Sequence, residues 1–415
     1  MGTSASCDLV DGWALSEQEL VRELVLARGR AMEWLARPEK EREASGYLHT
    51  FREILQQPAT WLETCERAVA HTEALRLAIE GARAVVLTGS GSSEYAGECV
   101  RFALQKELDA VAVTAGGGEL LADSNAVIPP VRPALMVSLA RSGDSPESLG
   151  ALEAVRKREP AIRQLVITCN RAGGLALACA GAPAVHVLTL DDRTNDRSLV
   201  MTSSFTNVVL AAGYLSMLDA PEHYRQICRR LSGICRALLL GYFDRLIEIA
   251  ERPFDRVVFL GFGAAWGAAR ESALKMLEMT AGRIAAMSET YLGFRHGPMS
   301  FAGDKTLLVC YLSSDPVRRA YESDLIHELH RKDLGLANVI VGENIPETLV
   351  RPRDAAIELA GLGEIGDDHA PVIQVVVGQL LAFGRCMAEG LHPDSPSQNG
   401  VIQRVVDSFP LYLME

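Results

Sequence analysis

The sequence predicts an α/β protein built from two tandem domains, each a parallel sheet flanked by helices. From residue 81 onward, short β-branched runs alternate with helical patterns. Continuous apolar strands of this kind are typical of parallel sheets covered on both faces. Segment 85–104 also aligns with segment 257–276 at an offset of 172 residues, and each consists of an apolar strand, G-x-G and a helix. Such self-similarity indicates a duplicated domain.

The predicted elements follow this plan in order. The first set of strands comprises 84–88, 111–114, 134–140, 164–169 and 184–190, with helices at 93–107, 145–158 and 173–180. The second set comprises 256–261, 283–287, 306–313 and 337–341. A long helical region, about 199–250, joins the two sets, and a last apolar helix is expected at 371–390.

The predicted domains are a helical N-terminal segment (1–80), a first α/β domain (81–222), a second (240–391) and a C-terminal tail (392–415). Ser16 and Glu19 have the spacing of a capping box at the start of the first helix.

Composition narrows the class of protein. The 415 residues are 48% hydrophobic and carry a net charge of −12, so a basic nucleic-acid surface is not expected. The nine cysteines form no C-x-x-C pair, which disfavours a disulfide scaffold or zinc ribbon. The sequence shows no signal peptide and no apolar run of the ~20 residues that a membrane span needs. A cytoplasmic location is therefore expected.

Two Ser-rich turns follow predicted strands and open helices. The first is Gly89-Ser90-Gly91-Ser92-Ser93, and the second contains Arg141, Ser142 and Ser145 before Pro146. Glycines allow close backbone approach, and helix N-termini attract anions. Serine is also a preferred helix cap, so either turn alone is weak evidence. Together, at the carboxyl ends of neighbouring parallel strands, they predict a phosphate site, with Arg141 able to pair with the anion.

A third region, 271–298, carries candidate acid–base groups. Glu271, Lys275 and Glu278 fall on one helical face. A solvated ion-pair face is one interpretation of this pattern. However, the helix is expected to pack in an α/β layer, where Glu278 lies among apolar side chains and is a candidate general base. His296, in the loop F-R-H-G-P, could transfer protons near neutral pH or could be an ordinary surface residue.

These motifs together resemble the sugar-isomerase (SIS) superfamily. T-G-S-G-S-S, A-R-S-G-D-S-P-E-S, L-E-M-T-A-G and G-F-R-H-G-P are most similar to the galactosamine-6-phosphate deaminase/isomerase family, also described as tagatose-6-phosphate ketose/aldose isomerases. The resemblance covers roughly residues 80–300 well and the rest loosely.

The resemblance implies two flavodoxin-like SIS domains, a homodimer or higher homo-oligomer, and a small sugar phosphate as substrate. No nucleic-acid or membrane partner is expected, because the chain is acidic and has no apolar run long enough for a membrane span. It implies phosphate binding by Ser92, Ser93, Ser142 and Ser145. Glu278 falls where the related glucosamine-6-phosphate synthases keep the base that moves a proton between C1 and C2. His296 falls where they keep a ring-opening histidine supplied by the neighbouring subunit.

Two positions depart from the synthase pattern. Ala140, followed by Arg141, replaces a serine of the synthase phosphate loop. The synthase C-terminal lysine has no counterpart in Q-R-V-V-D-S-F-P-L-Y-L-M-E, where Arg404 is the nearest cation.

The expected activity is deaminating isomerisation of galactosamine 6-phosphate to tagatose 6-phosphate and ammonia, without metal or organic cofactor. About 80 residues precede the first domain, fewer than a glutaminase domain of ~100–200 residues needs, so ammonia release is expected rather than glutamine-dependent amination. A plain ketose/aldose isomerase is the main alternative, and a non-catalytic phosphosugar-binding regulator is a second.

Overall fold

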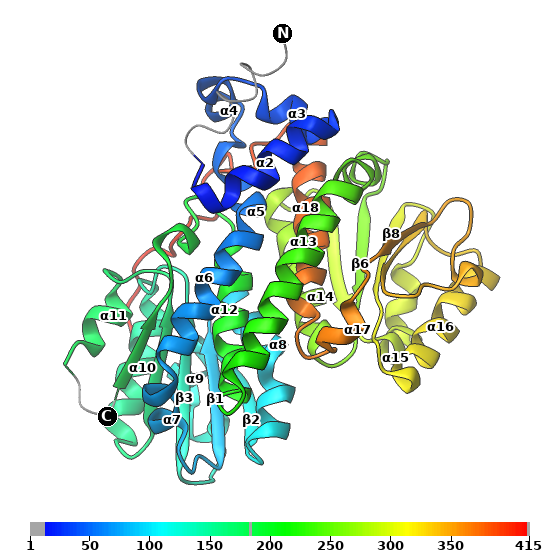
Figure 1. Cartoon of the computed structure of the whole chain (residues 1–415). Coiled ribbons are helices and arrows are strands. Elements are labelled where there is room, and N and C mark those ends of the chain that lie inside the picture. The colour runs from blue at the N-terminus through cyan, green and yellow to red at the C-terminus, as the bar shows by residue number, and fades with distance from the viewer. Residues whose placement is uncertain (1–12, 182–184, 413–415) are drawn as a thin grey trace.

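The computed structural model describes residues 13–181 and 185–412 and contains two parallel sheets of five strands each (Figure 1). The first sheet has the order β2-β1-β3-β4-β5 and the second β10-β9-β8-β6-β7. Numbered within its own domain, each sheet has the order 2-1-3-4-5, the flavodoxin-like arrangement. The predicted fold class is therefore confirmed. The strands are β1 Ala84–Gly89, β2 Val111–Gly116, β3 Ala134–Ala140, β4 Arg163–Thr168, β5 Val185–Thr189, β6 Arg256–Leu260, β7 Ala285–Glu289, β8 Thr306–Tyr311, β9 Ala337–Gly342 and β10 Ala355–Glu358.

Helices cover both faces of each sheet. In the first domain they are α8 Ser92–Glu107, α9 Gly117–Val127, α10 Pro146–Arg158, α11 Gly174–Cys179, η1 Asp192–Thr194, α12 Ser203–Gly213 and η2 Tyr214–Ser216. In the second they are α14 Ala264–Met279, α15 Tyr291–Phe294, η3 Gly297–Phe301, α16 Pro316–Arg331, η4 Glu347–Leu349, α17 Leu362–Ile365 and α18 Pro371–Ala388. The long helix α13 Pro221–Ala250 joins the domains.

Two predicted elements differ from the structure, and one strand of the structure was not predicted. The strand predicted at 283–287 lies at Ala285–Glu289, and β10 was not predicted, because its four residues are too short to show a period. The helical region 199–250 is interrupted between η2 and α13, where Pro221 begins a new helix.

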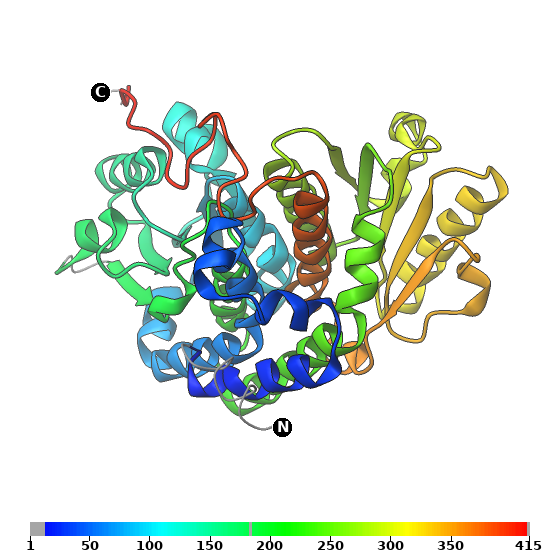
Figure 2. The same cartoon turned by 90° about the horizontal axis from the view of Figure 1, so that it is seen from above.

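Within residues 13–80, the N-terminal segment forms six helices that pack on the first domain and on α13 (Figures 1 and 2). They are α2 Leu15–Ala27, α3 Arg30–Leu35, α4 Glu39–Ala44, α5 Leu48–Leu55, α6 Gln57–Ala70 and α7 Thr72–Ile79. The predicted capping box of Ser16 and Glu19 is wrong, because the N-cap of α2 is Ala14 and the Glu17 carboxylate accepts from its backbone N–H.

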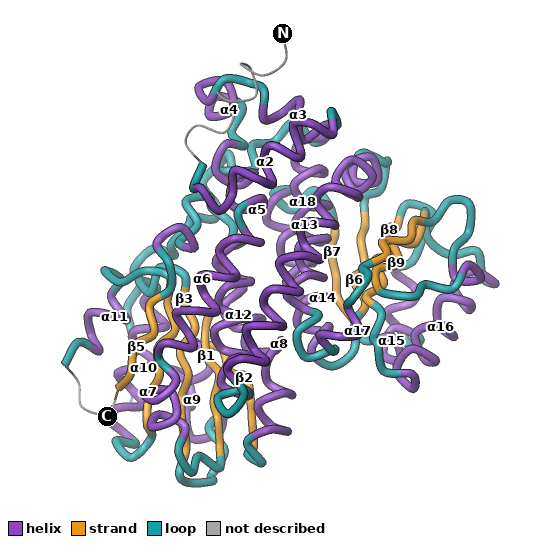
Figure 3. The backbone as a smooth tube through the Cα atoms, in the orientation of Figure 1, coloured by secondary structure: helices purple, strands orange, loops and turns teal. Residues whose placement is uncertain are grey.

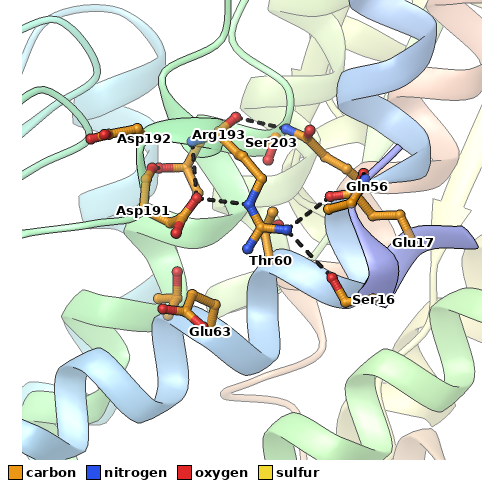
Figure 4. A network of polar contacts seen from close by, with 12 residues as sticks. Ser16, Glu17, Gln56, Thr60, Glu63, Asp191, Asp192, Arg193 and Ser203 are labelled. Carbon is orange, nitrogen blue, oxygen red and sulfur yellow. Dashed lines mark hydrogen bonds and ion pairs between the residues drawn. The ribbon is translucent and has the colours of Figure 1, made fainter. Parts of the chain in front are cut away.

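The guanidinium of Arg193 explains this start of α2 (Figure 4). It donates to the Asp191 carboxylate at 2.8 Å, to Glu17 at 2.9 Å and to the Ser16 hydroxyl at 3.4 Å. Ser16 therefore serves a tertiary contact between α2 and the segment after β5, instead of capping its own helix.

The core between the two sheets is helical (Figure 3). Helix α14 packs on α8 and α18, and α18 packs on α13. Among the described residues, α18 is the one helix that is both long enough and apolar enough to cross a membrane. However, 83% of it is buried inside the protein, as is usual for a core helix.

Helices α8 and α14 cross closely and run in opposite directions. A Cβ atom added at Gly267 would lie 2.7 Å from the backbone nitrogen of Cys99, so only glycine fits at this crossing. The start of α8, at Ser92, consequently meets the later turns of α14, at Lys275. This crossing brings the first Ser-rich turn to the acid–base residues of the second domain.

Candidate active site

A cavity of about 480 Å³ lies at the carboxyl end of the first sheet. The turn after β1, the start of α10, the segment before α12, helix α14 and the C-terminal tail all contribute to its wall. Its lining residues are Ser90, Gly91, Ser92, Arg141, Glu147, Leu199, Met201, Glu278, Gly400, Val401, Ile402, Gln403, Arg404, Val406 and Asp407. Ligands of open α/β sheets bind at this end of the strands.

A buried ammonium joins the two domains at this cavity. Lys275 Nζ donates to Ser92 Oγ at 3.0 Å and to the carboxylate of Glu278, and it lies 3.3 Å from a carboxylate oxygen of Glu271. The side chains of Glu271 and Lys275 are fully buried, whereas that of Glu278 is 23% exposed and lines the cavity. The solvated ion-pair face is therefore excluded for this helix, and Lys275 is a site residue that was not predicted as one.

Burial controls the protonation of this cluster. Burial raises the pKa of Glu271 to about 8, although the nearby Lys275 ammonium lowers it. Burial would lower the pKa of Lys275, but Glu271 and Glu278 outweigh that effect and raise it. The lysine therefore stays charged at neutral pH, while Glu271 is mostly protonated. Of the two carboxyl groups beside the ammonium, that of Glu278 is the one that faces the cavity.

Within the described part of the chain, the first Ser-rich turn supplies one unpartnered hydroxyl group to the cavity, that of Ser90, and the hydroxyl of Ser92, which accepts from Lys275. Ser90 Oγ is buried and has no hydrogen-bond partner among the described residues, and it lines the cavity beside Ser92. Ser93 Oγ contacts Met201 Sδ at 3.8 Å and does not line the cavity. Gly91 adopts φ 56°, so glycine is required between the two serines.

The second Ser-rich turn lies beside the first, because β1 and β3 are neighbours. Ser145 Oγ donates to Ser148 Oγ at 2.8 Å, and Ser142 Oγ accepts from the backbone N–H of Asp144 at 3.2 Å. Both serines are half-buried. Each hydroxyl thus has a local partner, and neither side chain is among those lining the cavity.

The guanidinium of Arg141 holds backbone segments around the cavity. It donates to the carbonyls of Ser198 at 3.2 Å, Leu199 at 2.9 Å and Arg404. Burial lowers its pKa, and the nearby Arg404 adds to this effect. Nη1 and Nη2 are thus already engaged in the protein, and Arg141 connects the second turn to the C-terminal tail.

The tail is fixed to the cavity by Arg404. Its guanidinium donates to the backbone carbonyl of Asp196 at 2.8 Å and to the side chain of Asn195 at 2.6 Å. Figure 2 shows the tail, in red, passing over the first domain. The role of the tail, unspecified by sequence, is thus to form one wall of the cavity.

Two buried carboxylates accept hydrogen bonds from the segment 197–204, next to the residues that Arg404 contacts. Asp196 accepts from the backbone N–H groups of Thr202 at 2.7 Å and Ser204 at 2.8 Å. Glu53 accepts from the N–H of Arg197 at 2.5 Å and from the Ser198 hydroxyl. Burial, with the nearby Asp196, raises the pKa of Glu53 to about 8.

His296 lies apart from these residues. It is exposed, it precedes η3 in the second domain, and it is not among the residues lining the cavity. Of the predicted site residues, Ser92, Arg141 and Glu278 therefore line one cavity. Ser93, Ser142 and Ser145 lie in the two turns that border this cavity. His296 belongs to neither group.

A larger cavity, about 860 Å³, lies elsewhere in the described part of the chain. Gly81 and Ala82, which precede β1, line it together with residues of η2 and His369. It is therefore at the amino end of the first sheet, away from the Ser-rich turns and from Glu278.

The two flavodoxin-like sheets and the Ser-rich turns beside Glu278 define a protein of the sugar-isomerase (SIS) class. No family model matches the chain, but individual proteins do. A tagatose-6-phosphate ketose/aldose isomerase from Escherichia coli is similar in structure, with a TM-score of 0.78 and 31% identity over 85% of this chain and 96% of that chain.

Two sequence relatives have names that specify both a substrate and a deamination. A Streptomyces coelicolor protein, provisionally named D-galactosamine-6-phosphate deaminase AgaS, is 38% identical over 88% of this chain and 95% of its own length. The D-galactosamine-6-phosphate deaminase AgaS of Shewanella sp. strain ANA-3 is 32% identical over 88% and 92%. The chain belongs to this AgaS family of amino sugar phosphate deaminases.

Proposed function

We propose that this chain converts galactosamine 6-phosphate and water to tagatose 6-phosphate and ammonia. The observation that carries the proposal is the contact of Lys275 with both Ser92 and Glu278. Through this contact Lys275 joins the turn that we propose binds phosphate to the glutamate that we propose as the base, beside one cavity. The names of the 32–38% identical relatives support this substrate.

The proposed reaction begins with the open-chain aldehyde of the substrate. Glu278 removes the proton from C2 and a proton is returned to C1, while O1 gains a proton and the amine nitrogen loses one, which leaves a hydroxymethyl group at C1 and a ketimine at C2. Water adds to C2, both of its protons pass to the nitrogen, and ammonia leaves with the electron pair of the C–N bond as the C2 carbonyl forms. Lys275 orients the Glu278 carboxylate through its hydrogen bond, and the Ser-rich turns hold the phosphate with hydroxyl and backbone N–H groups.

The experiment compares ammonia release from galactosamine 6-phosphate and glucosamine 6-phosphate with isomerisation of galactose 6-phosphate. Fast ammonia release from the first substrate is expected, with little turnover of galactose 6-phosphate. The second candidate, a plain ketose/aldose isomerase, is favoured by the name of the E. coli structure. Efficient turnover of galactose 6-phosphate without ammonia release from either amino sugar would establish that activity instead.

Glu278→Gln tests the base. The amide keeps the shape but accepts no proton, so ammonia release should fall ~100- to 10,000-fold with phosphate binding retained. Glu153→Gln, in which an exposed carboxylate of α10 is changed, is the matched control and should keep full activity. Exchange of the substrate C2 proton at the parent rate in Glu278→Gln would assign the base to another residue.

We further propose that His296 opens the sugar ring in the site of a neighbouring subunit, in a homo-oligomer. Its exposed position outside the cavity wall supports this arrangement. Mixed oligomers of Glu278→Gln and His296→Ala chains should regain part of the activity, because one mixed site has both residues intact. Verified mixed oligomers without any regain would contradict the shared site.

The chain is also proposed to act in the cytoplasm. All eight cysteines of the described residues are free and buried, which fits a reducing compartment.

A further inference from the structure

The second domain contains a counterpart of the second Ser-rich turn. Strand β8 pairs with β6 as β3 pairs with β1: Val309 lies opposite Phe259, and Val137 lies opposite Leu87. Counted from these pairs, Ser314 occupies the place of Ser142. The turn then reaches its helix two residues sooner, at Pro316 of α16 instead of Pro146 of α10.

This counterpart turn already binds an anion, which is the carboxylate of Asp367. The backbone N–H and the hydroxyl of Ser314 each donate to Asp367 Oδ1 at 2.7 Å. The hydroxyl of Ser313 donates to Oδ2, and the guanidinium of Arg318 donates to the same oxygen at 3.2 Å. Asp367 comes from the segment between α17 and α18, far from the turn in sequence.

The G-x-G turns of the two domains also differ in whether the space beside them is open or filled. Gly91 and Gly263 have the same backbone conformation, with φ 56° in both. A Cβ atom at Gly91 would find only Leu274, at 4.0 Å, whereas one at Gly263 would lie 3.4 Å from Arg318. The space that is open in the first domain is therefore occupied in the second by an arginine paired with Asp367.

We propose that the second domain retains a binding site for a phosphate monoester or similar oxyanion, and that the side chain of Asp367 occupies it as an internal ligand. Three side-chain donors and one backbone N–H group converge on one carboxylate, as they would on phosphate oxygens. The consequence is that each chain binds a single sugar phosphate, in its first domain, despite two sheets of the same topology. The inference rests on the proposed phosphate-binding role of the first domain.

The surrounding charges suit an anion at this position. Burial would raise the pKa of Asp367, but hydrogen bonds from Ser313 and Ser314 and the charge of Arg318 outweigh it and lower the pKa. Three further carboxylates are close, and one of them, Asp315, caps α16 by accepting from the backbone N–H groups of Val317 and Arg318. Burial raises the pKa of Glu322 to about 8, so it is mostly protonated at neutral pH, and Glu343 accepts from the backbone N–H groups of the segment 361–363.

Asp367→Ala in the full-length chain tests the proposal, with inorganic phosphate as the probe in titration calorimetry. The variant should bind one phosphate per chain more than the parent protein. Adding Ser314→Ala should remove that extra site, and Asp368→Ala, which removes a neighbouring carboxylate, should leave the parent stoichiometry. Phosphate binding by the parent protein measures the proposed site of the first domain. A parent protein that binds no phosphate would therefore count against the proposed function, whereas the extra site of Asp367→Ala tests the second domain.

A thermal measurement covers the case in which Asp367→Ala folds poorly. Phosphate should raise its melting temperature more than chloride at the same ionic strength, and it should do so less in Asp367→Ala/Ser314→Ala. A folded Asp367→Ala variant with the parent stoichiometry would overturn the proposal. So would a variant that stays unfolded in phosphate, since a returning anion should replace the lost carboxylate.

Discussion

Replacement of Lys275 by Met tests the buried cluster that joins the two domains. The change removes an ammonium that contacts Ser92, Glu271 and Glu278, and it keeps a side chain of similar length. Breaking a buried ion pair by removing one partner costs about 3–5 kcal/mol. The entropy of unfolding is about 0.9 kcal/mol per degree for 415 residues that unfold as one unit, so the melting temperature should fall by about 3–6 °C.

The size of this loss should depend on pH, because the folded-state pKa of Glu271, about 8, lies above its usual value of 4.5. A carboxyl with a raised pKa stabilises the fold below its unfolded pKa, and that stability is lost as the pH rises toward 8. In the parent protein this decline ends near pH 8, where Lys275 pairs with the ionised Glu271. Without Lys275 the pKa rises further, so the decline continues at about 1.4 kcal/mol per pH unit.

Calorimetry or circular dichroism at about pH 6 and pH 9 measures both effects. Lys332→Met is the matched control, because Lys332 forms an exposed pair with Glu328 that is worth at most about 1 kcal/mol. Its melting temperature should stay within about 1 °C of the parent at both pH values. Equal losses for Lys275→Met at pH 6 and pH 9, or a loss no larger than that of the control, would refute the assignment of a buried ammonium between two carboxylates.

Three further outcomes are expected. Ser93→Ala combined with Ser142→Ala should raise KM for the sugar phosphate more than it lowers kcat, because it removes binding that the substrate and the transition state share. Unchanged affinity in calorimetry would contradict the phosphate assignment. Glu53→Gln should flatten the fall in melting temperature as the pH rises from 5 to 8, because the folded-state pKa of Glu53 is about 8, and Glu43→Gln, at an exposed site, should follow the parent curve. Arg141→Gln should loosen the C-terminal tail, because three backbone carbonyls lose their donor, and limited proteolysis should then cut the tail faster; an unchanged cutting rate would show that the tail is held by other contacts.

The two domains could be predicted from sequence because their signals are local. Each strand of a covered parallel sheet is a continuous apolar run, and each G-x-G turn stands directly between a strand and a helix. The alignment of 85–104 with 257–276 corresponds to α8 and α14, whose starts, Ser92 and Ala264, differ by the predicted offset. The two Ser-rich turns were expected at one site because both follow neighbouring parallel strands, and ligands bind at the carboxyl ends of such strands.

Local patterns failed where tertiary contacts compete with them. Ser16 has the spacing of a helix cap, yet Arg193, from a distant segment, takes its hydroxyl. Arg141 stays a predicted phosphate ligand, but its sequence position gave no sign that its guanidinium donates to three backbone carbonyls, one of them in the tail. Spacing along the chain cannot specify a partner that lies far away in sequence.

The sequence by itself determined the fold class, the duplicated strand–turn–helix pattern and the identity of Glu278 as a candidate base. Only the tertiary structure decided that Lys275 is a fully buried partner of Ser92 and Glu278, because its burial arises where α8 crosses α14 at Gly267. It also decided that Asp367, from the segment before α18, fills the counterpart turn of the second domain. Protonation and anion binding depend on burial and on donors brought together in space, and neither can be read from the order of residues.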